Sequence, residues 1–170
     1  SGINFEIPAS VTFTTDRNLN VNGLTGAGTL DNSAASKTVT VGNSDASSAF
    51  SGVIKNTAGT LALTKIGTGT LTLSGANAYS GTTTISAGTL ALSGSGSIAD
   101  SSAVNVSTSG AIFDISGIST SGKTVGSLAG ASGTSIVLGQ KNVTAGSDNT
   151  STAVAGVISG TNGSLAKTGT

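Results

Sequence analysis

The chain has 170 residues, of which 28 are Ser, 27 are Thr and 26 are Gly, and it carries seven basic and seven acidic side chains with no His and no Cys. The charges are balanced and scattered and form no basic stripe, so nothing in the sequence supports binding of nucleic-acid phosphates. Without His or Cys the chain also lacks the groups of Ser-His-Asp and Cys-His catalysis and the ordinary ligands of zinc.

Short apolar runs with a period of two follow one another along the chain and predict β-strands. Gly, Asn or Ser separates the runs and β-branched residues are frequent within them, which favours strands over a disordered Gly- and Ser-rich linker. In chain order the predicted strands are VTF at 11–13, TVTV at 38–41, TLAL at 60–63, TLTL at 70–73, TISAGTLAL at 84–92, VNV at 104–106 and SIVL at 135–138.

Residues 109–170 repeat the pattern of residues 1–68 with small deletions. A period of about a hundred residues is typical of repeat proteins. We therefore expect residues 1–170 to form a single segment that holds one whole unit and most of a second, with both ends cutting through a unit of a longer rod. The matching runs are SGINFEIP with SGAIFDIS, LTGAG with LAGAS, and LTKIGT with LAKTGT.

The composition of the apolar residues predicts the architecture. They are mostly Val, Ile, Leu and Ala, with four Phe and one Tyr, and so they fill only a narrow core. A narrow core, Gly-rich corners and long-period repetition favour a solenoid whose coils stack on one another. The predicted fold is an all-β, right-handed parallel β-helix with no helices of note, since parallel crossovers take the right hand. At roughly 20 to 25 residues a coil the chain makes about seven or eight coils.

Residues 67–92 read GTGTLTLSGANAYSGTTTISAGTLAL, and this segment resembles the passenger-associated transport repeat of autotransporters, the type V secreted proteins. The resemblance implies a parallel β-helical passenger on the surface of a Gram-negative bacterium, anchored at the outer membrane or released. The positions that fall on the repeat pattern are Gly67, Gly69, Leu71, Leu73, Gly75, Asn77, Tyr79, Gly81, Thr83, Gly88, Leu90 and Leu92.

These motif residues are expected to have structural roles, and no ligand-binding residue can be named. GTLTL, TTTIS and GTLAL are three successive predicted strands, with Asn77 and Gly81 at the corners between them. Tyr79 is expected to cover the edge of the core. Two roles stay open for Asn77: stacking in an asparagine ladder with a neighbouring coil, or a local turn in which the side chain bonds its own backbone.

Carboxylates combined with Lys or Arg remain as groups for acid–base chemistry, and some β-helical polysaccharide-degrading enzymes use such a set. Glu6 and Asp114 are repeat equivalents inside strand-like runs, and Asp16 beside Arg17 fits a solvated turn, so we expect no catalytic site. We also expect no cofactor, no calcium site, since GGxGxD repeats are lacking, and no membrane insertion, since no apolar run approaches about 20 residues. The candidates weighed are Glu6, Asp16, Arg17, Asp31, Asp45, Asp100, Asp114, Asp148, Lys37, Lys55, Lys65, Lys123, Lys141 and Lys167.

The sequence therefore favours a non-enzymatic bacterial surface protein, a β-helical stalk or adhesin segment that mediates attachment or display. One alternative is a subunit that assembles head to tail into an extracellular filament or array, because no capping sequence is seen at Ser1 or Thr170 to protect the edge strands. A second is a polysaccharide-acting enzyme built on Glu6, Asp31 and Asp114. The partners considered are further copies of the chain and a host-cell or polysaccharide surface.

Overall fold

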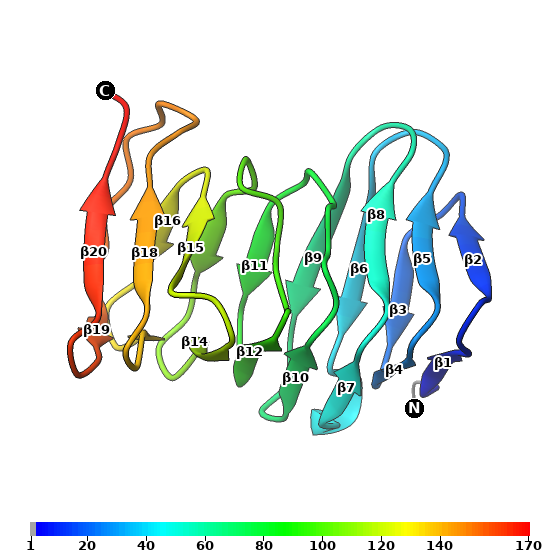
Figure 1. Ribbon diagram of the computed structural model, residues 1–170. Coiled ribbons are helices and arrows are strands. Elements are labelled where there is room, and N and C mark those ends of the chain that lie inside the picture. The colour runs from blue at the N-terminus through cyan, green and yellow to red at the C-terminus, as the bar shows by residue number, and fades with distance from the viewer. Residues whose placement is uncertain (1–2) are drawn as a thin grey trace.

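The computed structural model describes residues 3–170, which form a parallel β-solenoid of about seven turns (Figure 1). The all-β fold, the parallel stacking of coils and the lack of long helices are thus confirmed. Ser1 and Gly2, with which the predicted repeat begins, lie outside the described residues. Among residues 3–170 no helix is long or apolar enough to cross a membrane, since the single helix is a 3-10 turn at Asn43–Asp45.

The strands are short and follow one another at regular intervals. Each of the runs predicted from period-two alternation contains or overlaps a strand. In chain order they are β1 (Phe5–Ile7), β2 (Thr12–Thr15), β3 (Leu19–Val21), β4 (Leu24–Gly26), β5 (Thr29–Asn32), β6 (Lys37–Val41), β7 (Ser48–Phe50), β8 (Val53–Asn56), β9 (Leu61–Lys65), β10 (Thr70–Leu73), β11 (Thr83–Ile85), β12 (Thr89–Gly94), β13 (Val104–Val106), β14 (Ile112–Ile118), β15 (Gly122–Val125), β16 (Leu128–Gly130), β17 (Ser135–Val137), β18 (Asn142–Ala145), β19 (Val157–Ser159) and β20 (Ser164–Lys167).

Four parallel sheets make the sides of the solenoid. The long sheet has the order β1-β4-β7-β10-β12-β14-β17-β19, and the six-stranded sheet has the order β16-β13-β11-β9-β6-β3. The first short sheet is β2-β5-β8 and the second short sheet is β15-β18-β20. Both short sheets hold the same place in the coil, after a strand of the long sheet and before the six-stranded side. The chain thus winds round three sides in a fixed order.

The length of a coil follows from the register of neighbouring strands. In the long sheet Phe5 pairs with Leu24, 19 residues later, and Gly26 pairs with Phe50, 24 residues later. The coil length therefore varies by a few residues while the strands stay in register, because the extra residues lie in the corners between strands. Most coils match the predicted length of roughly 20 to 25 residues, and the shortest fall below it, as where Thr12 pairs with Thr29, 17 residues later.

Alternate residues of each strand point into a narrow core. Leu61, Leu63 and Lys65 of β9 are all buried, while the two residues between them are half-exposed. In the long sheet an inward column likewise runs from coil to coil, so that Leu90 of β12 pairs with Leu71 of β10 on one side and with Phe113 of β14 on the other. Each fully buried Leu or Phe contributes about 1.5–3 kcal/mol to the stability of the fold.

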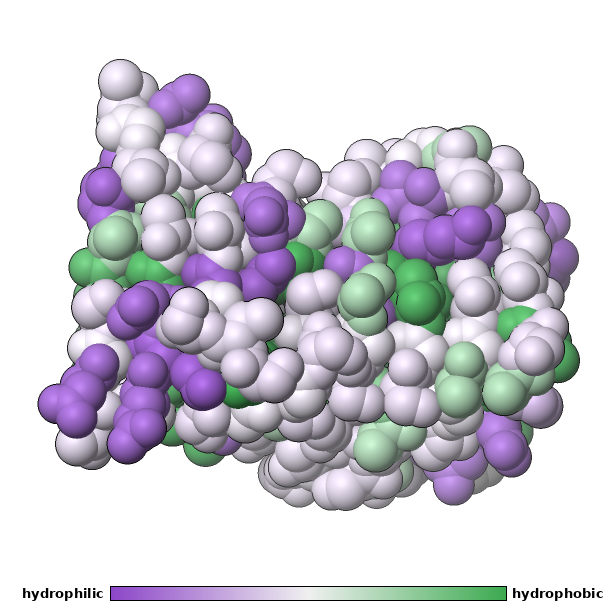
Figure 2. Space-filling model, in the orientation of Figure 1, coloured by the Kyte–Doolittle hydropathy of each residue, from purple (hydrophilic) through white to green (hydrophobic). Residues whose placement is uncertain are grey.

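Exposed large hydrophobic residues are confined to the two ends of the described solenoid. They are Ile3 and Val11 beside the first coil, and Val157 and Leu165 in the last one. Figure 2 shows a side surface that is mainly pale or purple, with green residues in small spots and at the end that carries β20. The sides are therefore polar surfaces suited to water, and the ends are apolar.

The two copies of the long repeat lie on different sides of the solenoid. β1 and its repeat equivalent in β14 are both in the long sheet, five coils apart. Among the strands that follow in each copy, β4 of the long sheet corresponds to β16 of the six-stranded sheet. Likewise, β6 of the six-stranded sheet corresponds to β18 of the second short sheet. The second copy is thus turned by one side relative to the first. Equivalent strands of the two copies therefore make similar contacts with adjacent coils, but on different sides of the solenoid.

Candidate functional site

The passenger-like motif occupies one coil and the start of the next. GTLTL lies on β10, TTTIS on β11 and GTLAL on β12, as three successive strands. Between β10 and β11, where the first three coils carry a strand of the first short sheet, the chain instead makes an irregular loop. A single parallel bridge, Ala76 with Ser97, joins this loop to the same region of the following coil. The motif therefore interrupts one side of the solenoid.

The four motif leucines lie in the core. Leu71 pairs with Leu90 and Leu73 pairs with Leu92, and each is at most 1% exposed. The Thr and Ala residues between them face outward and are half-exposed. The TLTL and TLAL pattern thus places two layers of leucine on top of each other at a spacing of about 4.8 Å.

The motif glycines lie where the loops of adjacent coils touch. A Cβ atom at Gly75 would overlap the carbonyl oxygen of Gly52, and one at Gly81 would lie 2.6 Å from the carbonyl oxygen of Leu61. Gly67 and Gly88 have φ angles of 67° and 61°, which disfavour any other residue. Gly69 likewise has no room for a Cβ, which would meet the carbonyl oxygen of Ala46.

Asn77 links three coils through its side chain. Its Oδ1 accepts a hydrogen bond from the amide of Ile54 at 2.8 Å, in the preceding coil. Its Nδ2 donates to the carbonyl oxygens of Gly75 at 3.0 Å and of Ser97 at 2.9 Å, the latter in the following coil. The residue is only 3% exposed. The local bond to Gly75 agrees with the predicted turn, but the side chain also replaces the missing strand as the partner of β8.

Tyr79 is inside the core, not at its edge as we expected from the sequence. Its side chain is fully buried, and its hydroxyl lies 2.8 Å from the hydroxyl of Thr83, which is also buried. Ser102 of the following coil donates a hydrogen bond to the carbonyl oxygen of Tyr79 at 2.8 Å. Burial raises the pKa of the Tyr79 hydroxyl. The loop that interrupts the short sheet thus places an aromatic ring in the core.

Lys65 is a buried cation, although the sequence indicated it only as one of six lysines available for acid–base chemistry and did not predict its burial. It takes an inward position at the end of β9 and is 0% exposed. Its Nζ donates to the carbonyl oxygens of Ile66, Gly67 and Ala87 at 2.6, 2.8 and 3.3 Å. Burial lowers the pKa of the Lys65 amine. The signal that could have found it is the repeated KIGT and KTGT, which places Lys167 in the equivalent position.

Several other charged candidates make contacts at the surface or the corners, some within a turn and some between neighbouring coils. Asp16 pairs with Arg17 at 3.1 Å, and Lys123 pairs with Asp100 at 2.6 Å. The amide of Thr68 donates to Asp45 and lowers the pKa of that carboxyl. Asp148 accepts hydrogen bonds from the amide and hydroxyl of Thr150, and these lower its pKa. The contacts of Asp16 and Asp148 hold turns in place, and those of Asp45 and Lys123 join neighbouring coils.

The three carboxylates of the enzyme hypothesis are not brought together. Glu6 is exposed on β1, whereas Asp114 lies five coils away on β14 of the same sheet and accepts a bond from the amide of Ser116. Asp31 is 6% exposed on β5, 3.6 Å from Lys55, and accepts a bond from the amide of Thr57. Within residues 3–170 there is also no group of three or more acidic side chains placed to hold a metal ion.

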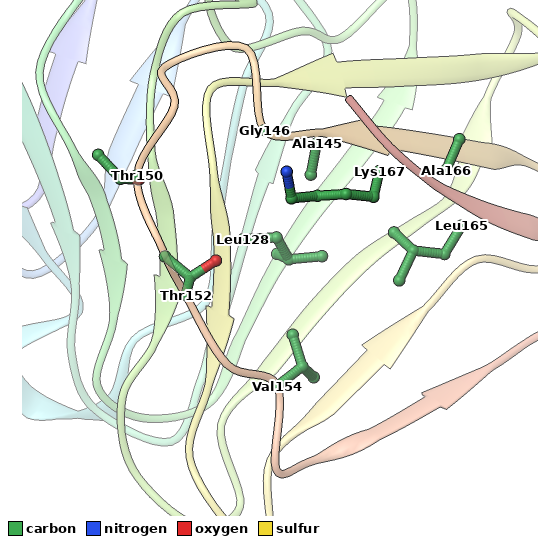
Figure 3. A pocket seen from close by; sticks show the side chains of 9 residues that line it. All are labelled: Leu128, Ala145, Gly146, Thr150, Thr152, Val154, Leu165, Ala166 and Lys167. Carbon is green, nitrogen blue, oxygen red and sulfur yellow. The ribbon is translucent and has the colours of Figure 1, made fainter. Parts of the chain in front are cut away.

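A cavity opens at the end of the solenoid that carries β20 (Figure 3). Its volume is about 140 Å³, and it is open to solvent on one side. In Figure 3 the side chains of Leu128, Leu165 and Lys167 point toward the same space. The residues that line it are Leu128, Ala145, Gly146, Thr150, Thr152, Val154, Leu165, Ala166 and Lys167.

Comparison with known proteins agrees with this geometry. Residues 63–92 match the family described as Passenger-associated-transport-repeat. Over 150 residues, 88% of its length, the chain is 36% identical to the protein named "Adhesin BmaC autotransporter" of Brucella suis biovar 1 (strain 1330). The chain spans only 4% of that relative. No solved structure matches it significantly. The transport repeat, the autotransporter relative and the parallel β-solenoid together identify the chain as part of an autotransporter passenger domain.

Proposed function

We propose that this segment is a non-enzymatic rod in a surface-exposed adhesin, and that it aids attachment by holding binding regions at a distance from the cell. The observation that carries the proposal is the parallel stacking of coils, continuous through the eight strands of the long sheet, beneath a polar side surface. The relative's name as an adhesin supports attachment as the purpose of such a rod.

The rod works by repetition. Each coil adds backbone hydrogen bonds to both neighbours and a layer of apolar side chains, so stiffness accumulates along the axis. At about 4.8 Å a coil, seven turns extend roughly 35 Å. Six of the seven acidic side chains, all but Glu6, take part in turns, ion pairs or contacts between coils, which supports a role that depends on shape and not on chemistry.

The polysaccharide-enzyme alternative receives no support from the positions of Glu6, Asp31 and Asp114. Incubation of the chain with neutral and acidic polysaccharides should release no new reducing or unsaturated ends. Release that is lost in Glu6→Gln, Asp31→Asn or Asp114→Asn would overturn the non-enzymatic proposal.

Two replacements in a displayed passenger that carries this segment test the rod. In one, a Gly- and Ser-rich linker of equal residue number replaces the segment; in the other, an unrelated parallel β-solenoid of equal coil number replaces it. Adhesion per displayed molecule should fall with the flexible linker and persist with the foreign solenoid. Loss of adhesion with both would show that the surface of the segment itself binds the target. Full adhesion with the linker would show that a rigid spacer is not needed.

A further inference from the structure

Two asparagines of the chain, Asn22 and Asn162, are followed directly by glycine. Such a pair is chemically labile, because glycine has no side chain to keep its backbone nitrogen away from the asparagine side chain. The nitrogen can attack the side-chain carbonyl carbon, Cγ, and expel ammonia. Whether it does so in a folded protein depends on how the local backbone is held, and the solenoid holds the two pairs differently.

Asn22 lies in a corner that is bonded to the coils on both sides. Its amide donates to the carbonyl oxygen of Ile3 at 2.8 Å, and the carbonyl oxygen of Gly23 accepts from the amide of Phe5 at 2.8 Å. The amide of Leu24, the next residue along the chain, donates to a serine side chain of the following coil. The side-chain oxygen of Asn22 is buried. Ring closure at this corner would therefore disturb contacts with two coils.

Asn162 lies in the corner between β19 and β20, and this corner is held loosely. The residue is exposed and has a positive φ of 64°, a conformation that asparagine tolerates in turns. Within residues 3–170, no hydrogen bond is made by the Asn162 side chain or by the amide of Gly163. The two reacting atoms, Cγ of Asn162 and the nitrogen of Gly163, are thus free of bonds that would have to break before they meet.

The exposure of this corner does not come from its place in the last described coil. By the long repeat, Asn162 and Gly163 correspond to Ala58 and Gly59. Further coils follow Ala58 and Gly59, and both residues are nevertheless exposed. A corner of this kind therefore stays open to water when coils stack on it. The positive φ falls on Gly59 in the first copy and on Asn162 in the second, so the second copy places the unusual conformation on the reactive residue.

We propose that Asn162 is a site of spontaneous deamidation in the folded rod. The backbone nitrogen of Gly163 loses its proton and bonds to Cγ of Asn162, while the C–N bond of the side-chain amide breaks and ammonia leaves. The product is a five-membered succinimide ring. Water, the only co-reactant, then opens the ring. Opening at Cγ gives aspartate, and opening at the main-chain carbonyl gives isoaspartate, in which the main chain runs through Cβ and Cγ of the modified residue.

Isoaspartate lengthens the corner by one main-chain atom and adds a negative charge to a chain whose formal net charge is zero. β20 begins two residues later at Ser164, which pairs with Asn142 of β18 and donates from its Oγ to Oδ1 of Asn142 at 2.9 Å. A longer corner shifts β20 against β18. The modification therefore loosens one side of the rod as the protein ages, while the pairing of β19 with β17 precedes the altered corner and is kept.

The test incubates the whole 170-residue chain at neutral pH in water enriched in heavy oxygen. Mass spectrometry that separates aspartate from isoaspartate follows both Asn-Gly pairs. Asn162 should convert several-fold faster than Asn22, with heavy oxygen in the products and isoaspartate as the larger one. In fully denaturing urea the two sites should convert at similar rates, which would show that the fold causes the difference. Asn162→Gln is the matched control and should not convert, because its ring closure is slower.

Amide hydrogen exchange measures the consequence for β20. Exchange in residues 164–167 should become faster as Asn162 converts and should stay unchanged in Asn162→Gln kept for the same time; unchanged exchange in the converted chain would overturn the loosening of β20. The site itself is overturned if Asn162 in the folded chain converts no faster than Asn22. It is also overturned if urea too dilute to unfold the chain raises the rate at Asn162, since conversion would then need an opened coil. None of these readouts depends on adhesion.

Discussion

The amine of Lys65 lies 3.3 Å from the carbonyl oxygen of Ala87, and this contact joins two successive coils through a cation in the core. The lysine takes the place of a third inward apolar residue on β9, and its aliphatic stem packs like one. Its charge is met at the corner by the carbonyl oxygens of Ile66, Gly67 and Ala87. A buried charge thus fixes where the corner of the next coil sits.

Lys65→Met should lower the free energy of unfolding at neutral pH by about 1–3 kcal/mol, because three carbonyl oxygens lose their donor. Burial lowers the pKa of Lys65 in the fold, so the unfolded chain binds more protons between the folded and the ordinary lysine pKa. The stability of the wild type should therefore rise with pH across that alkaline window, and the Met variant should lack the rise. Denaturant unfolding at several pH values measures both. Lys141→Met is the control and should change stability by less than about 0.5 kcal/mol.

Asn77→Ala should destabilise the chain by about 2–4 kcal/mol, since one side chain makes three hydrogen bonds to backbone groups of three coils. Amide exchange should show the loss first at Ile54, whose N–H would have no partner. Asn105→Ala on the outward face of β13 is the matched control and should have little effect. Equal stability of the two variants would contradict the bridging role of Asn77.

Tyr79→Phe and Thr83→Val should each cost about 1–3 kcal/mol, because each leaves the other buried hydroxyl without its partner. The double variant should cost clearly less than the sum, since both polar groups are then gone and the shapes are nearly kept. Thermal or urea unfolding of the four proteins gives the coupling energy. A strictly additive result would show that the two hydroxyls do not interact in the core.

Gly75→Ala should be destabilising by roughly 1–3 kcal/mol, because the added methyl group would overlap the carbonyl oxygen of Gly52 and push two coils apart. The matched change is Gly117→Ala, where the nearest atom is the carbonyl oxygen of Leu92 at 3.2 Å. This control should shift the melting temperature far less. If both changes were tolerated equally, the close approach of loops would not explain the motif glycines.

Strand positions were predictable because the information is local. The alternation in TVTV, TLTL and TLAL alone indicates which residues face the core, and the coil length follows from the spacing of such runs. What the sequence did not reveal depends on contacts between coils. Burial still alternates through the loop after β10, but its inward positions are Gly75, Asn77 and Tyr79, so the apolar pattern that marks the core ends at Leu73. Lys65 follows an apolar run and so marks its end in a sequence pattern, although its stem continues the core.

The orientation of the repeat was equally beyond the sequence. The runs LTGAG and LAGAS are alike because each precedes the same kind of corner, yet β4 and β16 belong to different sheets. The sequence similarity between the two copies reflects contacts with the next coil. These contacts are preserved when the second copy is shifted by one side of the solenoid relative to the first. Only the number of strands between two matching runs, which the structure supplies, shows that a turn has taken place.

The most direct test of the parallel, in-register stacking uses the fact that the chain has no cysteine. Thr72 and Ala91 face outward on β10 and β12 and are register partners. Their Cα atoms should lie about 4.8 Å apart, within the range that a disulfide spans. Oxidation of the Thr72→Cys, Ala91→Cys variant should give an intramolecular disulfide, whereas Thr72→Cys with Asp114→Cys, two coils apart, should not close. Closure of the second pair, or failure of the first in folded protein, would contradict the stacked-coil structure.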